Sequence, residues 1–213
     1  MRALNFHLPQ TRARAPVTED RRLADAAGAA SGPLQGATSG PPQGTRAPGA
    51  APLLSAAECG LLLIRLTFGL LMAGHGAQKL FGIFGGSGLA ATGRGFDALG
   101  YHPGKVFALI GGLSELCGGL GLAVGLFTPL AAAAIIGVMI NAMVTVSGAH
   151  GLWSQDGGVE YNVAICVVAL AIAAIGPGRL ALDRFFPWRS GGWLAAAVAL
   201  GLGGLGAALA LNV

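Results

Sequence analysis

An apolar stretch from residue 61 to residue 84 constrains the fold most strongly, because it carries polar side chains at membrane depth. The stretch, LLLIRLTFGLLMAGHGAQKLFGIF, has about the ~20 residues that a helix needs to cross a bilayer. It nevertheless contains Arg65 near its start and His75, Gln78 and Lys79 near its end. A charged side chain that faces lipid costs several kcal/mol unless it has a partner. We therefore expect other segments of the chain to supply partners for these groups.

Composition places the whole chain in a membrane. Of its 213 residues, 54% are hydrophobic and only 10% are charged, whereas soluble domains have about 25% charged residues. Gly and Ala are frequent in the apolar runs, as in closely packed membrane helices. The sequence predicts an all-α, polytopic membrane protein with a four-helix bundle and a fifth C-terminal transmembrane helix. The five apolar segments are 59–80, 105–124, 128–147, 161–176 and 193–211.

The chain divides into three parts. Residues 1–55 are rich in Pro, Gly, Ala, Thr and Arg without an apolar period, which predicts a disordered tail. The twin arginine Arg21-Arg22 in this tail has no apolar run after it, so a secretory signal is rejected. Residues 56–185 form the predicted four-helix transmembrane domain. Residues 186–213 form an interfacial linker and the extra transmembrane helix.

The connections predict how the chain is oriented. The segment between the first two spans contains alternating apolar and polar residues, which favours a short interfacial helix over about 87–99. The linker at 179–189 carries three Arg, and loops rich in Lys and Arg stay on the cytoplasmic side. We therefore expect a multi-pass protein of the plasma membrane, in contact with the lipid bilayer. Its N-terminus is predicted to be cytoplasmic and its C-terminus to lie outside.

Glu115 in the second apolar segment is the obvious partner for a buried cation. Glycines three and four residues away on either side share its face, so this face is expected to pack closely against a neighbouring helix. We predict an ion pair between Arg65 and Glu115 at the floor of a polar cavity in the outer half of the bundle, roofed by Trp153 and the interfacial helix. The predicted cavity residues are Arg65, His75, Lys79, Glu115, Asn141, Glu160 and Tyr161.

Each of these residues also has a purely structural interpretation. The predicted Arg65–Glu115 pair would then only fix the helix register, and Lys79 would extend its amine to the lipid headgroups. His75 would be an interfacial packing residue, and Asn141 would make an interhelical hydrogen bond. These alternatives stay open at the level of the sequence.

Several classes of function are disfavoured by the residue pattern. The net charge is only +4, and no basic cluster alternates with aromatics, so nucleic acid is not an expected partner. No spacing of His, Cys and carboxylates resembles a metal site, and the three cysteines form no C-x-x-C pair. The Gly-rich stretch after residue 84 follows no strand, which argues against a dinucleotide site. No catalytic residue and no cofactor motif is evident.

Four motifs resemble the DoxX family of small membrane proteins. They are RLTFGLLMAGHGAQKLFGIFGGSG, ELCGGLGLAVGLFTPLAA, HGLW with GGVEYNVAI, and GPGRLALD, in order over about residues 58–185. The resemblance implies a four-helix membrane core and an association with redox metabolism, since the family is named after a subunit linked to thiosulfate oxidation with quinone reduction. The family motif positions fall on Arg65, His75, Lys79, Glu115, Glu160 and Tyr161.

The resemblance favours a membrane subunit of a quinone-linked oxidoreductase system, with a quinone or a small redox solute in the polar cavity. Its partner would be a soluble or membrane subunit of the same system. Two alternatives remain: a non-catalytic membrane anchor or assembly factor, and a small-solute transporter. Whether the protein is itself an enzyme is left open.

Overall fold

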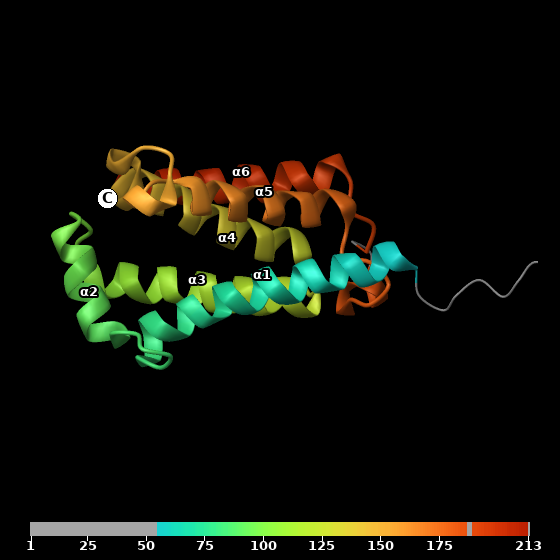
Figure 1. The fold of residues 1–213 in the computed structure, drawn as a ribbon, viewed down its shortest axis with the longest axis horizontal. Coiled ribbons are helices and arrows are strands. Elements are labelled where there is room, and N and C mark those ends of the chain that lie inside the picture. The colour runs from blue at the N-terminus through green and yellow to red at the C-terminus, as the bar shows by residue number, and fades with distance from the viewer. Residues whose placement is uncertain (1–54, 187–188, 213) are drawn as a thin grey trace, which may run out of the picture. The chain divides into compact units, whose positions relative to one another are not determined.

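The computed structural model describes residues 55–186 and 189–212, and the regular structure in these ranges is helical (Figure 1). Nearly all of the predicted N-terminal tail lies outside the described residues. After α4 the chain continues through a π-helical turn, Met143–Ser147, and a short 3-10 turn, Gly148–His150. The helices are α1 (Ala56–Phe81), α2 (Gly88–Ala98), α3 (Gly104–Val124), α4 (Thr128–Ala142), α5 (Glu160–Ile175) and α6 (Trp193–Leu211).

Among the described residues, four helical segments are long and apolar enough to cross a membrane. They are α1, α3, α6 and the continuous stretch Thr128–His150 that begins with α4. The apolar helix α5 has 16 residues, which gives it a length of about 24 Å, somewhat less than the roughly 30 Å of a bilayer core. The predicted class, a polytopic helical membrane protein, is confirmed.

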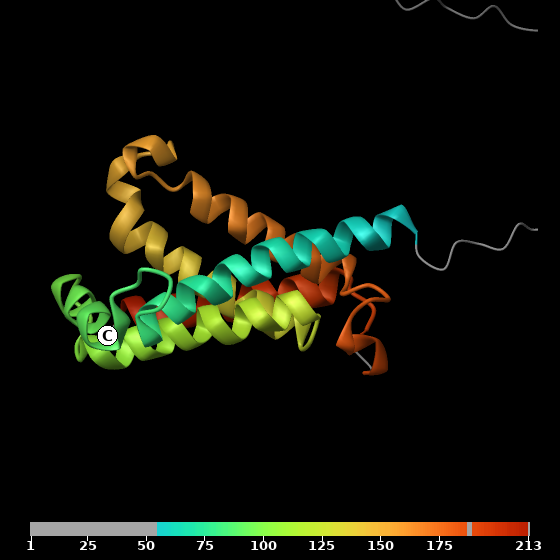
Figure 2. The ribbon, with the colours of Figure 1, turned by 60° about the horizontal axis from the view of Figure 1, so that its bottom comes forward.

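Successive long helices alternate in direction, and α4 lies among its neighbours (Figures 1 and 2). Helix α1 packs along α3, whereas α4 packs against α3, α5 and α6. The predicted fifth transmembrane helix, α6, therefore packs directly onto the bundle, chiefly on α4.

Glycines allow the two tightest helix pairs to approach closely. A Cβ atom on Gly69 of α1 would lie 2.6 Å from the carbonyl oxygen of Gly119 on α3. A Cβ atom on Gly203 of α6 would lie 2.8 Å from the carbonyl oxygen of Ala133 on α4. Neither site has room for a larger residue. These contacts are the small-residue packing typical of helices in lipid.

The two ends of the bundle differ in structure. The hairpin end contains the tight turn between α3 and α4 at residues 125–127 and the linker between α5 and α6 at residues 176–186. Gly125 and Phe127 in that turn both have positive φ, of 67° and 49°. The α2 end contains residues 82–103 and the loop at 147–159. Helix α2 at this end confirms the short helix predicted over about 87–99.

Candidate ligand-binding site

Glu115 is buried in α3, with 2% of its surface exposed, and forms an ion pair with Lys79 of α1. The Lys79 ammonium donates a hydrogen bond to Oε1 of Glu115. The predicted pair between Arg65 and Glu115 is therefore wrong. Its physical reason is the helix register: Arg65 is level with Leu122 of α3, seven residues beyond Glu115, or about 10 Å along the helix.

The second carboxylate oxygen of Glu115, Oε2, has no hydrogen-bond partner among the described residues. In that part of the chain, it is the one buried side-chain nitrogen or oxygen atom without a hydrogen-bond partner. Leaving a buried acceptor unsatisfied costs about 1–3 kcal/mol, and more for a charged group. Glu115 thus retains the capacity to accept a proton or a hydrogen bond.

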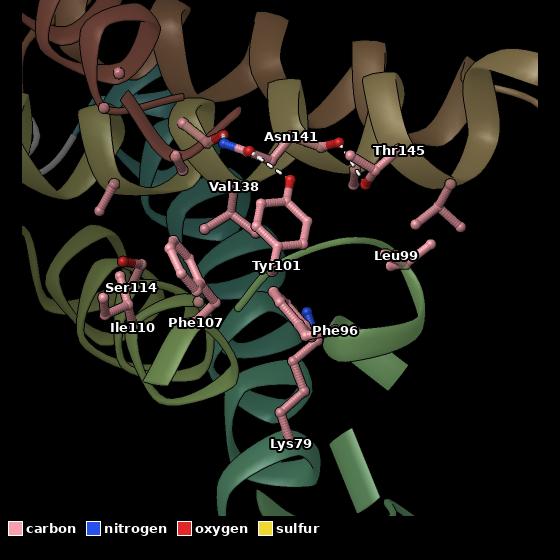
Figure 3. Close-up of a pocket in the computed structure, with 18 of the residues that line it drawn as sticks. Lys79, Phe96, Leu99, Tyr101, Phe107, Ile110, Ser114, Val138, Asn141 and Thr145 are labelled. Atoms are coloured by element: carbon pink, nitrogen blue, oxygen red, sulfur yellow. Dashed lines mark hydrogen bonds between the residues drawn. The ribbon is translucent and has the colours of Figure 1, made fainter. Parts of the chain in front are cut away.

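A cavity of about 360 Å³ lies next to this ion pair, between α2, α3, α4 and α6 (Figure 3). Lys79 reaches its wall from α1, so this side chain connects Glu115 to the cavity. The remaining wall is mostly aliphatic and aromatic. The lining includes Phe96, Leu99 and Tyr101 from the α2 end, Phe107, Ile110 and Ser114 from α3, Val138, Asn141 and Thr145 from the α4 segment, and Leu202, Gly203 and Gly206 from α6.

A tyrosine and an asparagine supply the polar link across the cavity. The Tyr101 hydroxyl donates a hydrogen bond of 2.9 Å to Oδ1 of Asn141, as Figure 3 shows. Asn141 Nδ2 in turn donates to the carbonyl oxygen of Gly137 at 2.9 Å. Phe96 and Phe107 lie on either side of Tyr101, with ring centroids 5.4 and 5.2 Å from its own. The phenol is thereby held between the α2 end, α3 and α4.

The cavity has an apolar rim on two helices that do not pack as a pair in the described structure, α3 and α6. Ile110 of α3 and Leu202 of α6 both line the cavity and are 54% and 47% exposed. Exposed aliphatic side chains on membrane-spanning helices face lipid. The cavity therefore has the rim expected of an opening toward the bilayer interior.

Arg65 belongs to a separate polar cluster at the hairpin end. It is 1% exposed, and its guanidinium donates to the carbonyl oxygens of Leu122 and Ala123 at 3.0 and 2.9 Å. It also donates to the carbonyl oxygens of Pro177 and Leu180 in the α5–α6 linker. Arg65 thus joins α1 to the end of α3 and to that linker, far along the bundle from the cavity.

Asp183 completes the hairpin-end cluster, and sequence reasoning missed it. Its fully buried carboxylate accepts hydrogen bonds of 2.8 Å from the backbone N–H groups of Phe127 and Thr128, and one of 2.6 Å from the Thr128 hydroxyl. Free N–H groups at a helix start favour an anion, so Asp183 caps α4 from a distant segment. The signal in the sequence is a lone acid within the Arg-rich linker GPGRLALD.

Besides Arg65, three of the predicted cavity residues lie elsewhere, and so does Trp153 of the predicted roof, whereas the predicted interfacial helix, α2, does line the cavity. His75 is exposed on α1 and does not line the cavity. Glu160 and Tyr161 are exposed at the start of α5, a helix that contributes nothing to the cavity wall among the described residues. Glu160 accepts hydrogen bonds from the backbone N–H and the hydroxyl of Ser154, and so closes the preceding loop. Trp153 in that loop is exposed and forms no roof. Lys79 and Asn141 do line the cavity, and Glu115 is in contact with Lys79.

The fold and the cavity define a polytopic helical membrane protein with a buried ion pair beside a chamber within its spans. Residues 60–148 match the family model DoxX. That range covers α1 to α4, so this part of the chain is similar to the DoxX family. The part of the resemblance beyond residue 148 stays a prediction. No curated protein and no solved structure matches the chain.

Proposed function

We propose that this protein is a membrane subunit of an oxidoreductase system and that its cavity binds the ring of a membrane quinone. The observation that carries the proposal is the cavity itself, an apolar chamber with polar groups near the α2 end and an apolar rim. Ligand sites are typically lined in this way, with a few polar groups that fix orientation. A ligand dissolved in the bilayer would reach this chamber without crossing water.

The charges around the cavity favour a neutral ligand over an anion. Lys79 is the charged side chain among the described residues of the wall, and Glu115 already neutralises it. A phosphate or carboxylate would therefore find no net positive charge in the cavity to attract it. Quinone carbonyl oxygens accept hydrogen bonds, and an ammonium has more donors than the one that Glu115 uses. The hydroxyl of Ser114 is a further donor on the wall, and the oxygen of the Tyr101 hydroxyl, which donates its proton to Asn141, can still accept a hydrogen bond.

The unused oxygen of Glu115 suits a ligand whose protonation changes. A bound quinone would supply reversible redox chemistry in which protons accompany the electrons exchanged with a partner subunit. Lys79 would hold the ring oxygen by a hydrogen bond. Glu115 would hold the Lys79 ammonium in place and accept a proton on Oε2, which lacks a partner among the described residues.

The proposed location is the plasma membrane, with the hairpin end on the cytoplasmic side. Arg179, Arg184 and Arg189 lie in the segment between α5 and α6, and positive loops tend to remain in the cytoplasm. In this orientation the α2 end, and with it the cavity, belongs to the outer half of the membrane. The redox partner would then exchange electrons with a ligand held near the outer surface.

The test is the quinone content of the purified protein. The wild type, Lys79→Met and His75→Ala are purified in mild detergent, extracted with organic solvent and assayed for quinone by chromatography and mass spectrometry. We expect the wild type and His75→Ala to retain quinone and Lys79→Met to lose most of it. His75→Ala is the matched control, since His75 is exposed on the same helix outside the cavity. Absence of quinone from the wild type, before and after incubation with added quinone, would favour the anchor interpretation.

A further inference from the structure

A second cavity lies beyond the first one, toward the hairpin end. It is a groove of about 440 Å³ between α3 and α4, lined on α3 by Cys117, Gly121 and Val124 and on the other side by Leu130 of α4 and by Phe127 just before that helix. Its described walls contain no charged side chain and no amide. Ala134 of α4 lines both the groove and the cavity beside Lys79. The two spaces are therefore neighbours that share a wall residue.

The residues that line the two spaces form one continuous face on α4. Phe127 lies just before the helix, and Leu130, Ala134, Val138 and Asn141 follow one another along it at spacings of three or four residues. Residues at that spacing lie on the same side of a helix. Only the last of the five, Asn141, carries a polar side chain. The face is polar near the α2 end and apolar toward the hairpin end.

Helix α3 presents a matching face. Its members are Ile110, Ser114, Cys117, Gly121 and Val124, again three or four residues apart. Three of them have small side chains, which leave space for the groove between the two helices. The two helices pack closely here, since a Cβ atom on Gly118 would lie 3.1 Å from the carbonyl oxygen of Ala131. The cavity and the groove thus follow the same pair of helices over most of their length.

The length and polarity of this path fit an amphiphile that lies along the bilayer normal. From Thr128 to Asn141, α4 rises about 20 Å, against roughly 30 Å for the hydrocarbon core of a bilayer. A ligand with its ring at Lys79 would leave its tail pointing toward the middle of the membrane and beyond. The groove begins where that tail would leave the cavity.

We propose that the groove between α3 and α4 binds the isoprenoid tail of the quinone whose ring the cavity holds. This inference rests on the proposed function. A single groove accommodates one chain, which favours a quinone over a phospholipid with two acyl chains. The neutralised Lys79 also gives no net attraction to a phosphate headgroup. The protein would therefore select membrane quinones by their tails as well as by their rings.

The experiment compares two probes and two double variants of the full chain in quinone-free nanodiscs. The probes are a benzoquinone with a short side chain and the same ring with a long polyisoprenoid side chain. Cys117→Phe/Leu130→Phe fills the groove from two exposed positions on its walls. Leu63→Phe/Val167→Phe is the matched control, placed at exposed positions outside both cavities.

We expect the groove variant to bind the long-tailed quinone about fivefold more weakly, because tail contacts of small individual energy are lost together. Its affinity for the short-chain quinone should match that of the wild type, which also shows that the variant is folded. The control should bind both probes normally. Equal affinities of the groove variant and the wild type for the long-tailed quinone would overturn the inference. Failure of the wild type to bind even the short-chain probe would overturn the proposed function.

A photoreactive group at the end of the long tail gives an independent readout. In the wild type it should label the peptide that contains Leu126–Leu130, and excess long-tailed quinone should prevent this labelling. Labelling of α5 or of lipid alone would place the tail outside the groove and contradict the inference.

Discussion

Both ends of the bundle bury charged side chains, but the hydrogen bonding of these side chains differs between the two ends. At the hairpin end, Arg65 donates four hydrogen bonds to backbone carbonyl oxygens, and nearby Asp183 accepts three from the start of α4. At the α2 end, Glu115 uses one carboxylate oxygen for Lys79 and leaves the other without a partner among the described residues. The cavity with polar groups on its wall lies beside Lys79 and Glu115.

This difference distinguishes buried charges that stabilise the fold from buried charges that can bind a ligand. A buried charge whose hydrogen-bonding capacity is used by the backbone has none left for a ligand, and it fixes the positions of the segments that it joins. A buried charge with spare capacity costs stability and is retained more readily where it serves a site. Arg65 and Asp183 are therefore assigned to the fold, and Lys79 and Glu115 to the proposed quinone site.

The strongest test of this comparison is Arg65→Leu. We expect a loss of about 3–5 kcal/mol in unfolding free energy, because the change removes the donor to four carbonyl groups at the hairpin end. Thermal unfolding in detergent measures this loss. Quinone affinity of the folded protein should be unchanged, with Arg65→Lys as the control that keeps the charge but not the planar geometry. A weakened quinone affinity in folded Arg65→Leu would break the comparison.

The next test is a double-mutant cycle with Lys79→Met and Glu115→Leu. Because the two groups are in direct contact, we expect a coupling free energy of about 1–3 kcal/mol in thermal unfolding. The same cycle with Arg65→Leu and Glu115→Leu should be additive within about 0.5 kcal/mol, since those residues share no contact. Coupling in the second cycle and not in the first would reverse the assignment of the two ends.

A smaller effect is expected for Tyr101→Phe. This change removes the hydroxyl that bonds Asn141 and should lower the unfolding free energy by about 1 kcal/mol. It also removes the hydrogen bond that holds the Asn141 side chain on the cavity wall, so the affinity for a short-chain quinone should fall. Phe96→Leu, a change of shape on the same wall, is the control for a packing effect. An affinity loss equal in both variants would show that the Tyr101 hydroxyl has no role of its own.

The smallest effect is expected for His75→Ala. The imidazole is exposed and outside the cavity, so the unfolding free energy should change by less than about 0.5 kcal/mol. Quinone content should match that of the wild type. A loss of quinone in His75→Ala would place this residue in the site after all.

The class of fold was predictable because it follows from apolar length alone. The four long apolar helical segments and the short helix α2 correspond to stretches whose hydropathy and Gly-rich breaks are visible in the sequence. The burial of Glu115 was also predictable, since glycines on both sides of it imply a close helix contact. Its partner was not. The choice between Arg65 and Lys79 depends on the register of α1 against α3, which the glycine contacts set.

The site was predictable only in part, for a similar reason. Lys79 and Asn141 were identified because polar side chains in apolar helices are rare and readily noticed. Tyr101 was missed because it lies in the connection between α2 and α3. The sequence does not show that this connection packs against α4, where the Tyr101 hydroxyl binds Asn141. Glu160 was misplaced because the sequence gives its depth in the membrane but not the side of α4 on which α5 packs.

The hairpin-end cluster also has a consequence for the biogenesis of the protein. Synthesis proceeds from the N-terminus, so Arg65 is inserted with α1 well before the linker that carries Pro177, Leu180 and Asp183 has been made. Until then, the carbonyl partners described for Arg65 are limited to those of α3, and α4 lacks its Asp183 cap. The segment that matches the DoxX family ends at residue 148, so on its own it is an unfinished assembly whose closure depends on the arrival of the chain that follows.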